Sequence, residues 1–583
     1  MASSQGGSFS QHQLYRWDPI LDSRRKLSDQ HNQPFIDTLS EYDLASDFIT
    51  SFMQACDEND TCNYATEAVV KFCQGADFQS LRHNTRATTE VVALLDDGVG
   101  LTAWDLYQAL IKPKKESFRS RMYICNGRIQ KKARTGSPSR QQAKKAREQH
   151  MNIQKVYIPY LTSWTVIALT ASAPRYQATA LGKFISNHLR SDLLINAAII
   201  SFLTSFVFQF QLPYFALRKH RLPQRDARKL RQYEDITFLR TMGSKVDNSP
   251  TEYIYESKIS CLIIGTSRYS WSGLLINDQY FETDDEIESI ADYVEQGSEG
   301  MMPDPFAAGK KPIGDLPSDP RELFLITLEI YLRRISKEYH EVSMAVDEAV
   351  RLYTRKFWEE KICRGSFGND NRKISDIDKH RSELREEHQE WMRRSVELLR
   401  RLTNILNQYS DKWRVFSDTG QNYFISTDDP GYSDGLRKSL VDIHGHIIEL
   451  EGLRSNFKHT LKRCEDMSHF FNLRIAVEGG ESAFSQQKTA RDVKVLTWIT
   501  FLSLPFALAA SLLSTQEGYI PINPSPGALL ASIAALEGAI WLVLGSLLGW
   551  DWFKAEVGGW LPRQQRIRDT ETEEFELQQG GLD

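Results

Sequence analysis

Residues 495–550 decide the fold, because they contain two long apolar runs. The first run is residues 495–514 (VLTWITFLSLPFALAASLLS), and the second is residues 527–550 (GALLASIAALEGAIWLVLGSLLGW). About 20 apolar residues in a helix cross the roughly 30 Å hydrocarbon core of a bilayer. We therefore expect two transmembrane helices. The alternative is a buried helical hairpin in a water-soluble core, where apolar runs of this length are uncommon.

The charges around the two runs predict their orientation in the membrane. The connecting loop, residues 515–526, contains one charged residue, Glu517. Basic side chains lie on both outer flanks, namely Lys488, Arg491, Lys494, Lys554, Arg563, Arg566 and Arg568. Because basic flanks stay on the cytoplasmic side, we expect the loop outside and both termini inside. The sequence thus predicts an integral, multi-pass protein, and we expect it in the plasma membrane.

The remaining sequence has the composition of a soluble protein. The 583 residues are 25% charged and 41% hydrophobic, as in ordinary globular domains. A net charge of −5 gives no reason to expect a nucleic-acid partner. The seven scattered cysteines favour free thiols in a reducing compartment. The first residues contain no apolar segment typical of a secretory signal.

Composition and periodicity divide the chain into regions of an α+β protein. In order, we expect a mainly helical region (1–110), a basic disordered linker (111–149), an α/β cytosolic domain (150–320), a helical stalk (321–494), the first transmembrane helix (495–514), an external loop (515–526), the second transmembrane helix (527–550) and a cytosolic tail (551–583). The linker is rich in Lys and Arg, so it is either a solvated connection or a segment that contacts anionic lipid.

The expected α/β domain contains a third apolar stretch, residues 193–217. Polar residues such as Asn196 and Gln209 interrupt it, so we expect a buried helix followed by a strand rather than a membrane span. Two further strands are predicted at residues 258–265 and 270–281, separated by a polar turn.

Long helices are predicted after residue 320. Asp319 is a suitable cap, and Pro320 suits the first helical position. Apolar residues then recur at spacings of three, four and seven, at Ile377, Leu384, Trp391, Leu398, Leu402, Ile405 and Tyr409, and again at Leu436, Leu440, Ile443, Ile447, Leu450, Phe457, Leu461, Cys464, Met467 and Phe471. Such spacing is typical of helices packed in a coiled coil or bundle.

This layout resembles the CorA-like divalent cation (magnesium) transporters, particularly the divergent fungal members. The resemblance covers residues 150–555. It is carried by residues 495–505 (VLTWITFLSLP), 210–218 (FQLPYFALR), 259–265 (ISCLIIG) and 319–324 (DPRELF). It implies an N-terminal α/β domain, a helical stalk, a first membrane helix that lines a pore and a second, outer helix. It further implies a homo-oligomer, a pentamer, with a divalent cation such as Mg²⁺ as the transported ion and no other cofactor.

The chain departs from this family at the outer end of the first membrane helix. The family carries Gly-Met-Asn there, and the corresponding positions are Ser514, Thr515 and Gln516, followed by Glu517. Only Gln516 keeps a side-chain amide. Selectivity for magnesium therefore does not follow from the resemblance, although a ring of Glu517 carboxylates would attract cations.

Small and hydroxylated residues form one stripe along the first run. At about 100° per residue, Thr500, Ser503, Ala507, Ser511 and Ser514 share about a quarter of the helix circumference. Thr497 and Leu504 border this stripe. The stripe either lines a hydrated pore or packs against another helix, since helix interfaces in membranes favour the same small residues.

Two functions remain open from the sequence. The chain is either an oligomeric metal cation channel with a degenerate selectivity motif or a non-conducting, membrane-anchored scaffold that keeps the CorA-like architecture. We expect no enzyme activity, because no phosphate-binding loop, nucleophile elbow or His-Glu-x-x-His motif is present.

Overall fold

The computed structural model describes residues 16–25, 32–39, 47–56, 63–96, 98–112, 152–200, 204–239, 251–282, 293, 303–364, 374–424, 430–514 and most of 526–542. Most of the expected linker, the external loop up to residue 525, the last part of the second apolar run and the tail lie outside these residues. The chain divides into two compact units, Met1–Ser468 and His469–Asp583.

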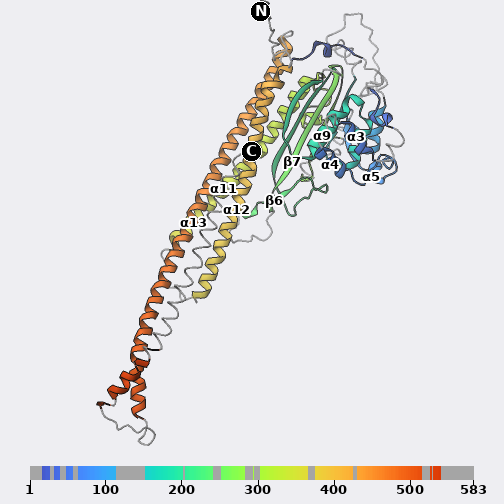
Figure 1. The fold of residues 1–583 in the computed structure, drawn as a ribbon. Helices are drawn as coiled ribbons and strands as arrows, with labels where there is room; N and C mark the ends of the chain where they lie inside the picture. The colour runs from blue at the N-terminus through green and yellow to red at the C-terminus, as the bar shows by residue number, and fades with distance from the viewer. Residues whose placement is uncertain are drawn as a thin grey trace, which may run out of the picture. The chain divides into compact units, whose positions relative to one another are not determined.

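A mixed sheet forms the centre of the first unit (Figure 1). Its order in the described residues is β2-β1-β3-β8-β7-β5-β4, and β6 pairs with β7. The strands are β1 (Val91–Leu95), β2 (Gly100–Thr102), β3 (Asn152–Ile158), β4 (Leu194–Ile200), β5 (Ser205–His220), β6 (Tyr233–Asp235), β7 (Thr251–Ser267) and β8 (Ser270–Asn277). Strands β3 and β8 are parallel, and the other pairs are antiparallel.

The side chains of strand β5 alternate between the two faces of the sheet. It pairs with β7 from Phe206↔Gly265 to His220↔Thr251. Because side chains alternate along a strand, Phe208 and Phe210 share one face, and Gln209 and Gln211 share the other. Residues 193–217 therefore form two paired strands, β4 and β5, rather than the expected helix and strand. In β5 the polar residues that interrupt the apolar pattern, Gln209 and Gln211, alternate with the phenylalanines, as expected for a strand.

One face of the sheet is covered by short helices. Figure 1 shows α3 (Phe48–Cys56), α4 (Asn63–Phe72), α5 (Thr85–Thr89) and α9 (Arg175–Leu189) on this side. Together with α6 (Ala103–Ile111) and α8 (Ser163–Ser172), they share one hydrophobic core with the sheet residues Leu262, Ile264, Leu274 and Ile276. Helix α8 is buried over nearly its whole length.

Residues 1–110, which were expected to be mainly helical, contribute strands to the same sheet as residues 150–320. Residues 91–95 form β1, which pairs with β3 at Leu94↔Tyr157 and Leu95↔Val156. The strands expected at 258–265 and 270–281 are present as β7 and β8, and β7 is longer than expected.

Three long helices follow, namely α11 (Pro320–Arg364), α12 (Ile374–Val415) and α13 (Pro430–Ser514). The predicted start is confirmed, because the Asp319 carboxylate accepts a hydrogen bond from the Arg321 backbone N–H at 2.9 Å. Phe324 of α11 lies against Phe208 of β5, with ring centroids 5.6 Å apart. The long helices thus cover the second face of the sheet.

The predicted apolar positions of the helices are largely buried. In α13 this holds for Leu436, Leu440, Ile443, Ile447, Leu450, Phe457, Cys464, Met467 and Phe471, and in α12 for Trp391, Leu398, Leu402 and Tyr409. Leu461 and Ile405 are half-buried, and the side chains of Ile377 and Leu384 lie outside the description.

The second unit contains the end of α13 and short helical stretches between residues 526 and 542. Helix α13 continues through Gly479 and Gly480 and ends at Ser514. Among the residues described, no helix meets both the length and the apolarity that a membrane crossing requires.

The sheet packs tightly around Gly265, in β7. A Cβ atom there would lie 2.5 Å from Trp271 Cβ, 2.6 Å from the Ser270 carbonyl oxygen and 2.8 Å from Phe206 Cζ. We expect Gly265→Ala to lower the free energy of unfolding of the first unit by about 3 kcal/mol, because these atoms must move. Hydrogen exchange of the β7 amides reports this change.

Gly273→Ala, in the adjacent strand, is the matched control. Its nearest contacts would be 3.3 to 3.4 Å from ring atoms of Trp271 and Phe306. A small adjustment accommodates them, at a cost of about 1 kcal/mol or less. Equal effects of the two substitutions would contradict the packing described at Gly265.

Candidate functional site

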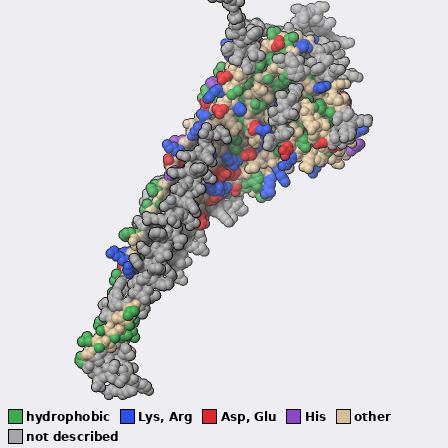
Figure 2. Space-filling model, in the orientation of Figure 1, with side chains coloured by type: hydrophobic (Ala, Val, Ile, Leu, Met, Phe, Trp, Pro, Cys, Tyr) green, Lys and Arg blue, Asp and Glu red, His purple; other side chains and the backbone are tan. Residues whose placement is uncertain are grey.

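The residues expected to line a pore lie on the last turns of α13. Thr497, Thr500, Ser503, Leu504, Ala507 and Ser511 are all helical and exposed in this structure. Figure 2 shows hydrophobic side chains on the lower part of α13, around the same turns. Ser514 is the last helical residue. Thr515, Gln516 and Glu517, the other positions expected to form a filter, lie outside the described residues.

The hydroxyl groups of the stripe donate to their own helix. Thr497 Oγ1 donates to the Val493 carbonyl at 2.7 Å, and Thr500 Oγ1 donates to the Leu496 carbonyl at 2.9 Å. Ser503 Oγ donates to the Thr500 carbonyl at 3.1 Å. Each proton is thereby directed at the backbone, while the lone pairs of each oxygen remain as acceptors. The stripe can accept hydrogen bonds from water or bind a cation weakly, but it carries no charge.

A second polar site lies inside the first unit, around the buried carboxylate of Asp278. Arg231 Nε donates to Oδ2 at 2.8 Å, and the Arg228 guanidinium lies 2.9 Å from Oδ1. His188 Nε2 is 3.5 Å from Oδ1. Asp278 and His188 are fully buried. Arg231, together with Arg228, which also pairs with Asp226 at 2.9 Å, thus compensates a carboxylate that has no access to solvent, which is a condition for burying such a charge.

The same cluster stabilises the end of α9. The Lys258 Nζ atom donates to the carbonyls of Asn187 and Arg190 at 2.5 and 2.6 Å. Arg231 donates to the His188 carbonyl at 2.6 Å. The last carbonyls of a helix have no partner within the helix and carry partial negative charge. Lys258 and Arg231 supply the missing donors, so the cluster joins β7 and the 221–232 loop to α9.

Burial and charge set the protonation states of this cluster. Burial alone would raise the pKa of Asp278, but Arg228, Arg231 and His188 outweigh it and hold that pKa well below its ordinary value. Burial lowers the pKa of His188 to about 4, although Asp278 acts in the opposite direction. Burial also holds the pKa of Lys258 well below its ordinary value. His188 is therefore neutral at pH 7.

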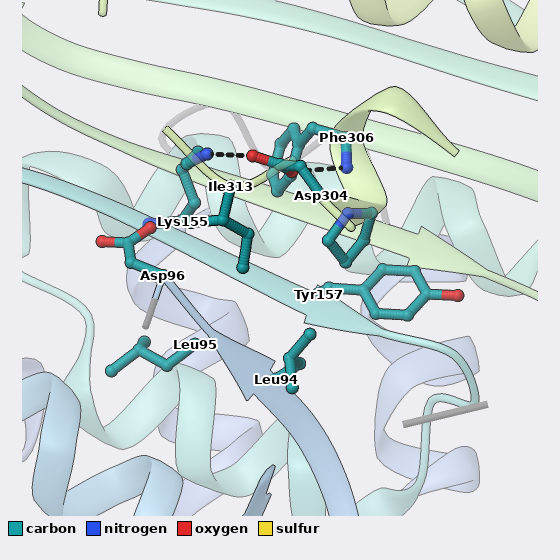
Figure 3. A pocket seen from close by; sticks show the side chains of 9 residues that line it. Leu94, Leu95, Asp96, Lys155, Tyr157, Asp304, Phe306 and Ile313 are labelled. Atoms are coloured by element: carbon teal, nitrogen blue, oxygen red, sulfur yellow. Dashed lines mark hydrogen bonds and ion pairs between the residues drawn. The ribbon is translucent and has the colours of Figure 1, made fainter. Parts of the chain in front are cut away.

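A small cavity lies beside β1 and β3 (Figure 3). Lys155 Nζ lies 2.6 Å from Asp304 Oδ2, and the Lys155 backbone N–H donates to Asp96 at 2.6 Å. In Figure 3 the aromatic rings of Tyr157 and Phe306 also line the cavity. Its volume of about 10 Å³ is roughly the space for one water molecule. It is too small for an organic substrate.

The described residues were expected neither to contain nor to lack a metal site, and His444, His446 and the cysteines are the side chains of interest. No group of three or more His, Cys, Asp or Glu suited to a metal ion occurs there. His444 accepts from Trp413 Nε1 at 3.2 Å, and His446 lies 3.4 Å from Glu449. Cys56, Cys73, Cys261 and Cys464 are buried free thiols, as expected.

Sequence reasoning missed the Asp278 cluster. Its members come from α9, the 221–232 loop, β7 and the residue after β8, so no local spacing joins them. One available signal was the segment 218–231, where seven Lys or Arg accompany a single acid, Asp226.

Of the comparisons with known proteins, the one with solved structures found similar chains. No protein-family model matches the chain, and no curated protein matches it. It is similar to the complete structure of the CorA magnesium transporter from Methanocaldococcus jannaschii, with 9% identity and a TM-score of 0.26, over 68% of this chain and 90% of that chain. It is also similar to the full-length CmaX protein, with 13% identity and a TM-score of 0.24, over 67% and 88%. These values are too low to assign a fold or a function.

The depressed pKa of His188 predicts a loss of stability in acid. Below about pH 6.5 the unfolded chain binds a proton at His188, while the folded chain does not bind it until about pH 4. His188 therefore contributes stability that is present above pH 6.5 and lost as the pH falls to 4. We expect a loss of about 3 kcal/mol from this residue over that interval.

The measurement is hydrogen exchange of the β7 amides at pH values between 4 and 7, after correction for the intrinsic exchange rate. His188→Gln should flatten the dependence on pH, even if it lowers stability at pH 7. His459→Gln, at an exposed position of α13, is the control and should leave the slope unchanged. An unchanged slope in His188→Gln would show that other groups cause the acid sensitivity.

Proposed function

We propose that the chain is a CorA-like integral membrane protein that assembles as a homo-oligomer and conducts metal cations with little selectivity. The observation that carries this proposal is the exposed stripe of oxygen-bearing side chains on α13, within the first apolar run. The lipid bilayer, with the plasma membrane as the expected location, would cover the remaining apolar surface of the run.

The chemistry of the stripe indicates the kind of conduction. The oxygens of Thr497, Thr500 and Ser503 act as acceptors, since their protons are directed at backbone carbonyls. Neutral oxygens can replace part of a cation's hydration shell or hold its water. Mg²⁺ gives up its water reluctantly, so it would pass such a stripe in hydrated form or not at all.

Assembly into an oligomer would bring several copies of the stripe to one axis. Exposed apolar side chains continue along the preceding part of α13, at Leu473, Val477 and Phe484. Their spacings of four and seven residues are those of a helix seam that pairs with other helices. We take five copies from the resemblance, with the second apolar run outside the pore.

The rival function is a non-conducting scaffold with the same architecture. The observation that favours it is the replacement of Gly-Met-Asn by Ser514, Thr515 and Gln516. Gln516 has one more rotatable bond than Asn, so fixing its amide in a ring costs more conformational entropy. Glu517 would still concentrate cations at the entrance without distinguishing among them.

Removing oxygen from the stripe tests the proposed pore. We expect Thr500→Val/Ser503→Ala to reduce cation flux into proteoliposomes by about tenfold or more, because two acceptors per copy are lost from the pathway. Val495→Ile, at an exposed position on another side of α13, is the matched control and should retain most of the flux. If both variants conduct like the unmodified protein, α13 does not line the pathway through this stripe.

Restoring the family motif separates the channel from the scaffold. We expect magnesium uptake by the unmodified protein to be weak or absent, and Ser514→Gly/Thr515→Met/Gln516→Asn to raise it several-fold, because Asn can hydrogen-bond the first-shell waters of Mg²⁺. Strong, magnesium-selective uptake without the change would contradict the filter argument. Absence of any cation flux before and after the change would favour the scaffold.

A further inference from the structure

Helix α13 carries a second apolar face in the first unit, on the side that its own chain leaves uncovered. Leu440, Ile443 and Ile447 are buried against the rest of the unit. Val441 and Ile448 are instead 64% and 53% exposed. They are seven residues apart, so they lie on the same side of the helix, two turns from each other. Two large apolar side chains thus point into solvent at the spacing of a helix that pairs with another helix.

Two glycines share this face with the apolar side chains. At about 100° per residue, Val441, Gly445, Ile448 and Gly452 fall within about 60° of the helix circumference. A Cβ atom at either glycine would have no contact within 4 Å beyond its chain neighbours and the backbone of its own helix. Glycine weakens a helix interior relative to alanine, so the fold of one chain gives no reason for these glycines. A position without a side chain does allow a second helix to approach closely.

The charges that flank this face suit a parallel partner. The spacing of four and three residues between positions 441, 445, 448 and 452 is that of the a and d positions of a coiled coil. In this register Arg437 and His444 occupy g positions, and Asp442 and Glu449 occupy e positions. In a parallel pair each g residue meets the e residue five positions further along the other helix. Arg437 would thus meet Asp442 of a second copy, and His444 would meet Glu449. Within the described part of their own chain, neither Arg437 nor Asp442 forms an ion pair.

The side chains of His444 and Glu449 can reach a second helix although each has a contact in its own chain. Trp413 Nε1 donates to His444 Nδ1 at 3.2 Å, so His444 Nε2 carries a proton that it can donate to a carboxylate. The Glu449 side chain is 58% exposed. One of its oxygens lies 3.4 Å from His446 Nδ1, and the carboxylate keeps further lone pairs as acceptors.

We propose that α13 pairs in parallel with α13 of a second copy of this chain through this one face, called the α13 seam below. The α13 seam consists of Val441, Gly445, Ile448 and Gly452. The proposal rests on the homo-oligomer proposed above and names the surface at which the first units of two copies meet. Copies related by rotation about an axis along α13 have this helix in the same direction, as the flanking charges require. An antiparallel pair would instead bring Asp442 near Glu449 of the second copy, and the two carboxylates would repel each other.

Disulfide formation in the full-length protein tests the α13 seam. A disulfide joins only cysteines whose Cα atoms are less than about 7 Å apart. We expect Val441→Cys and Ile448→Cys, each alone, to form a disulfide with the same position of a second copy under mild oxidation with copper phenanthroline, as identified by mass spectrometry. Met344→Cys, at a 62% exposed position of α11, is the matched control and should give at least five times less. In an antiparallel pair Val441 would face Gly452, so neither single variant would crosslink.

A charge placed in the α13 seam should separate the helices. We expect Gly445→Glu to lower the disulfide yield of Ile448→Cys by at least about fivefold, because the introduced carboxylates would face each other in the interface. Gly435→Glu is the matched control, since its position is equally open and is turned about 100° away from the α13 seam. It adds the same charge and helix propensity and should leave the yield unchanged. Hydrogen exchange of the β7 amides should be the same in both variants, which shows that the first unit is folded.

Exchanging the flanking charges tests the parallel register. Arg437→Glu should lower the disulfide yield of Val441→Cys by about threefold, because the introduced carboxylate would face Asp442 of the second copy. Arg437→Glu/Asp442→Arg exchanges the two charges and should restore the yield. Added salt should reduce the difference between these variants.

The mass of the purified protein in detergent distinguishes failure of the α13 seam from failure of the proposed oligomer. An oligomer in which neither Val441→Cys nor Ile448→Cys crosslinks would overturn the α13 seam and leave the oligomer standing. A monomer would contradict both. Equal crosslinking of Met344→Cys, or a yield that Gly445→Glu does not change, would also overturn the α13 seam. The face would then belong to another occupant, such as a helix of a different protein.

Discussion

The buried carboxylate of Asp278 is the interaction on which one end of the sheet depends. It follows the last residue of β8, and its partners Arg228 and Arg231 belong to the loop between β5 and β6. Arg231 also binds the last turn of α9. A carboxylate cannot be buried without compensation, so the loop and the helix end must be in place whenever the sheet is complete. The cluster therefore holds the loop and the end of α9 in one arrangement at the ends of β7 and β8.

The long strand β5 connects this cluster to the helices that follow. One face of β5 contacts the short helices, as shown by Gln211, which donates to the Phe184 carbonyl of α9 at 2.9 Å. The other face carries the phenylalanines that contact α11. Near the end of β5, Arg218 forms a two-point ion pair with Glu338 of α11, with both distances 2.8 Å. The position of α11 on the sheet is thus fixed by apolar contact at one place and by charge at another.

The sequence predicts those parts of the fold that depend on residues close together in the chain, such as helix caps and helical periodicity. The start of α11 and the buried stripes of α12 and α13 depend on a cap and on helical periodicity, and both were read correctly. The sequence predicts a helix where β4 forms, because Leu194–Ile200 is almost uniformly apolar and a short apolar run has no distinguishing period. Strands β1 and β2 were missed because they are short. The Asp278 cluster requires contacts between distant residues, which spacing does not record.

The parallel pairing of β3 with β8 has a consequence for the order of folding. Asn152 pairs with Ser270 and Ile158 with Ile276, so the two strands meet only after the chain of α8, α9 and β4 to β7 has been made. Closing so large a loop costs entropy before any contact repays it. The adjacent hairpin of β7 and β8 closes through a short turn instead. During synthesis β3 can pair with β1, which precedes it, but its other edge stays unpaired until β8 leaves the ribosome. In that interval the unpaired edge is open to aggregation or to binding by a chaperone.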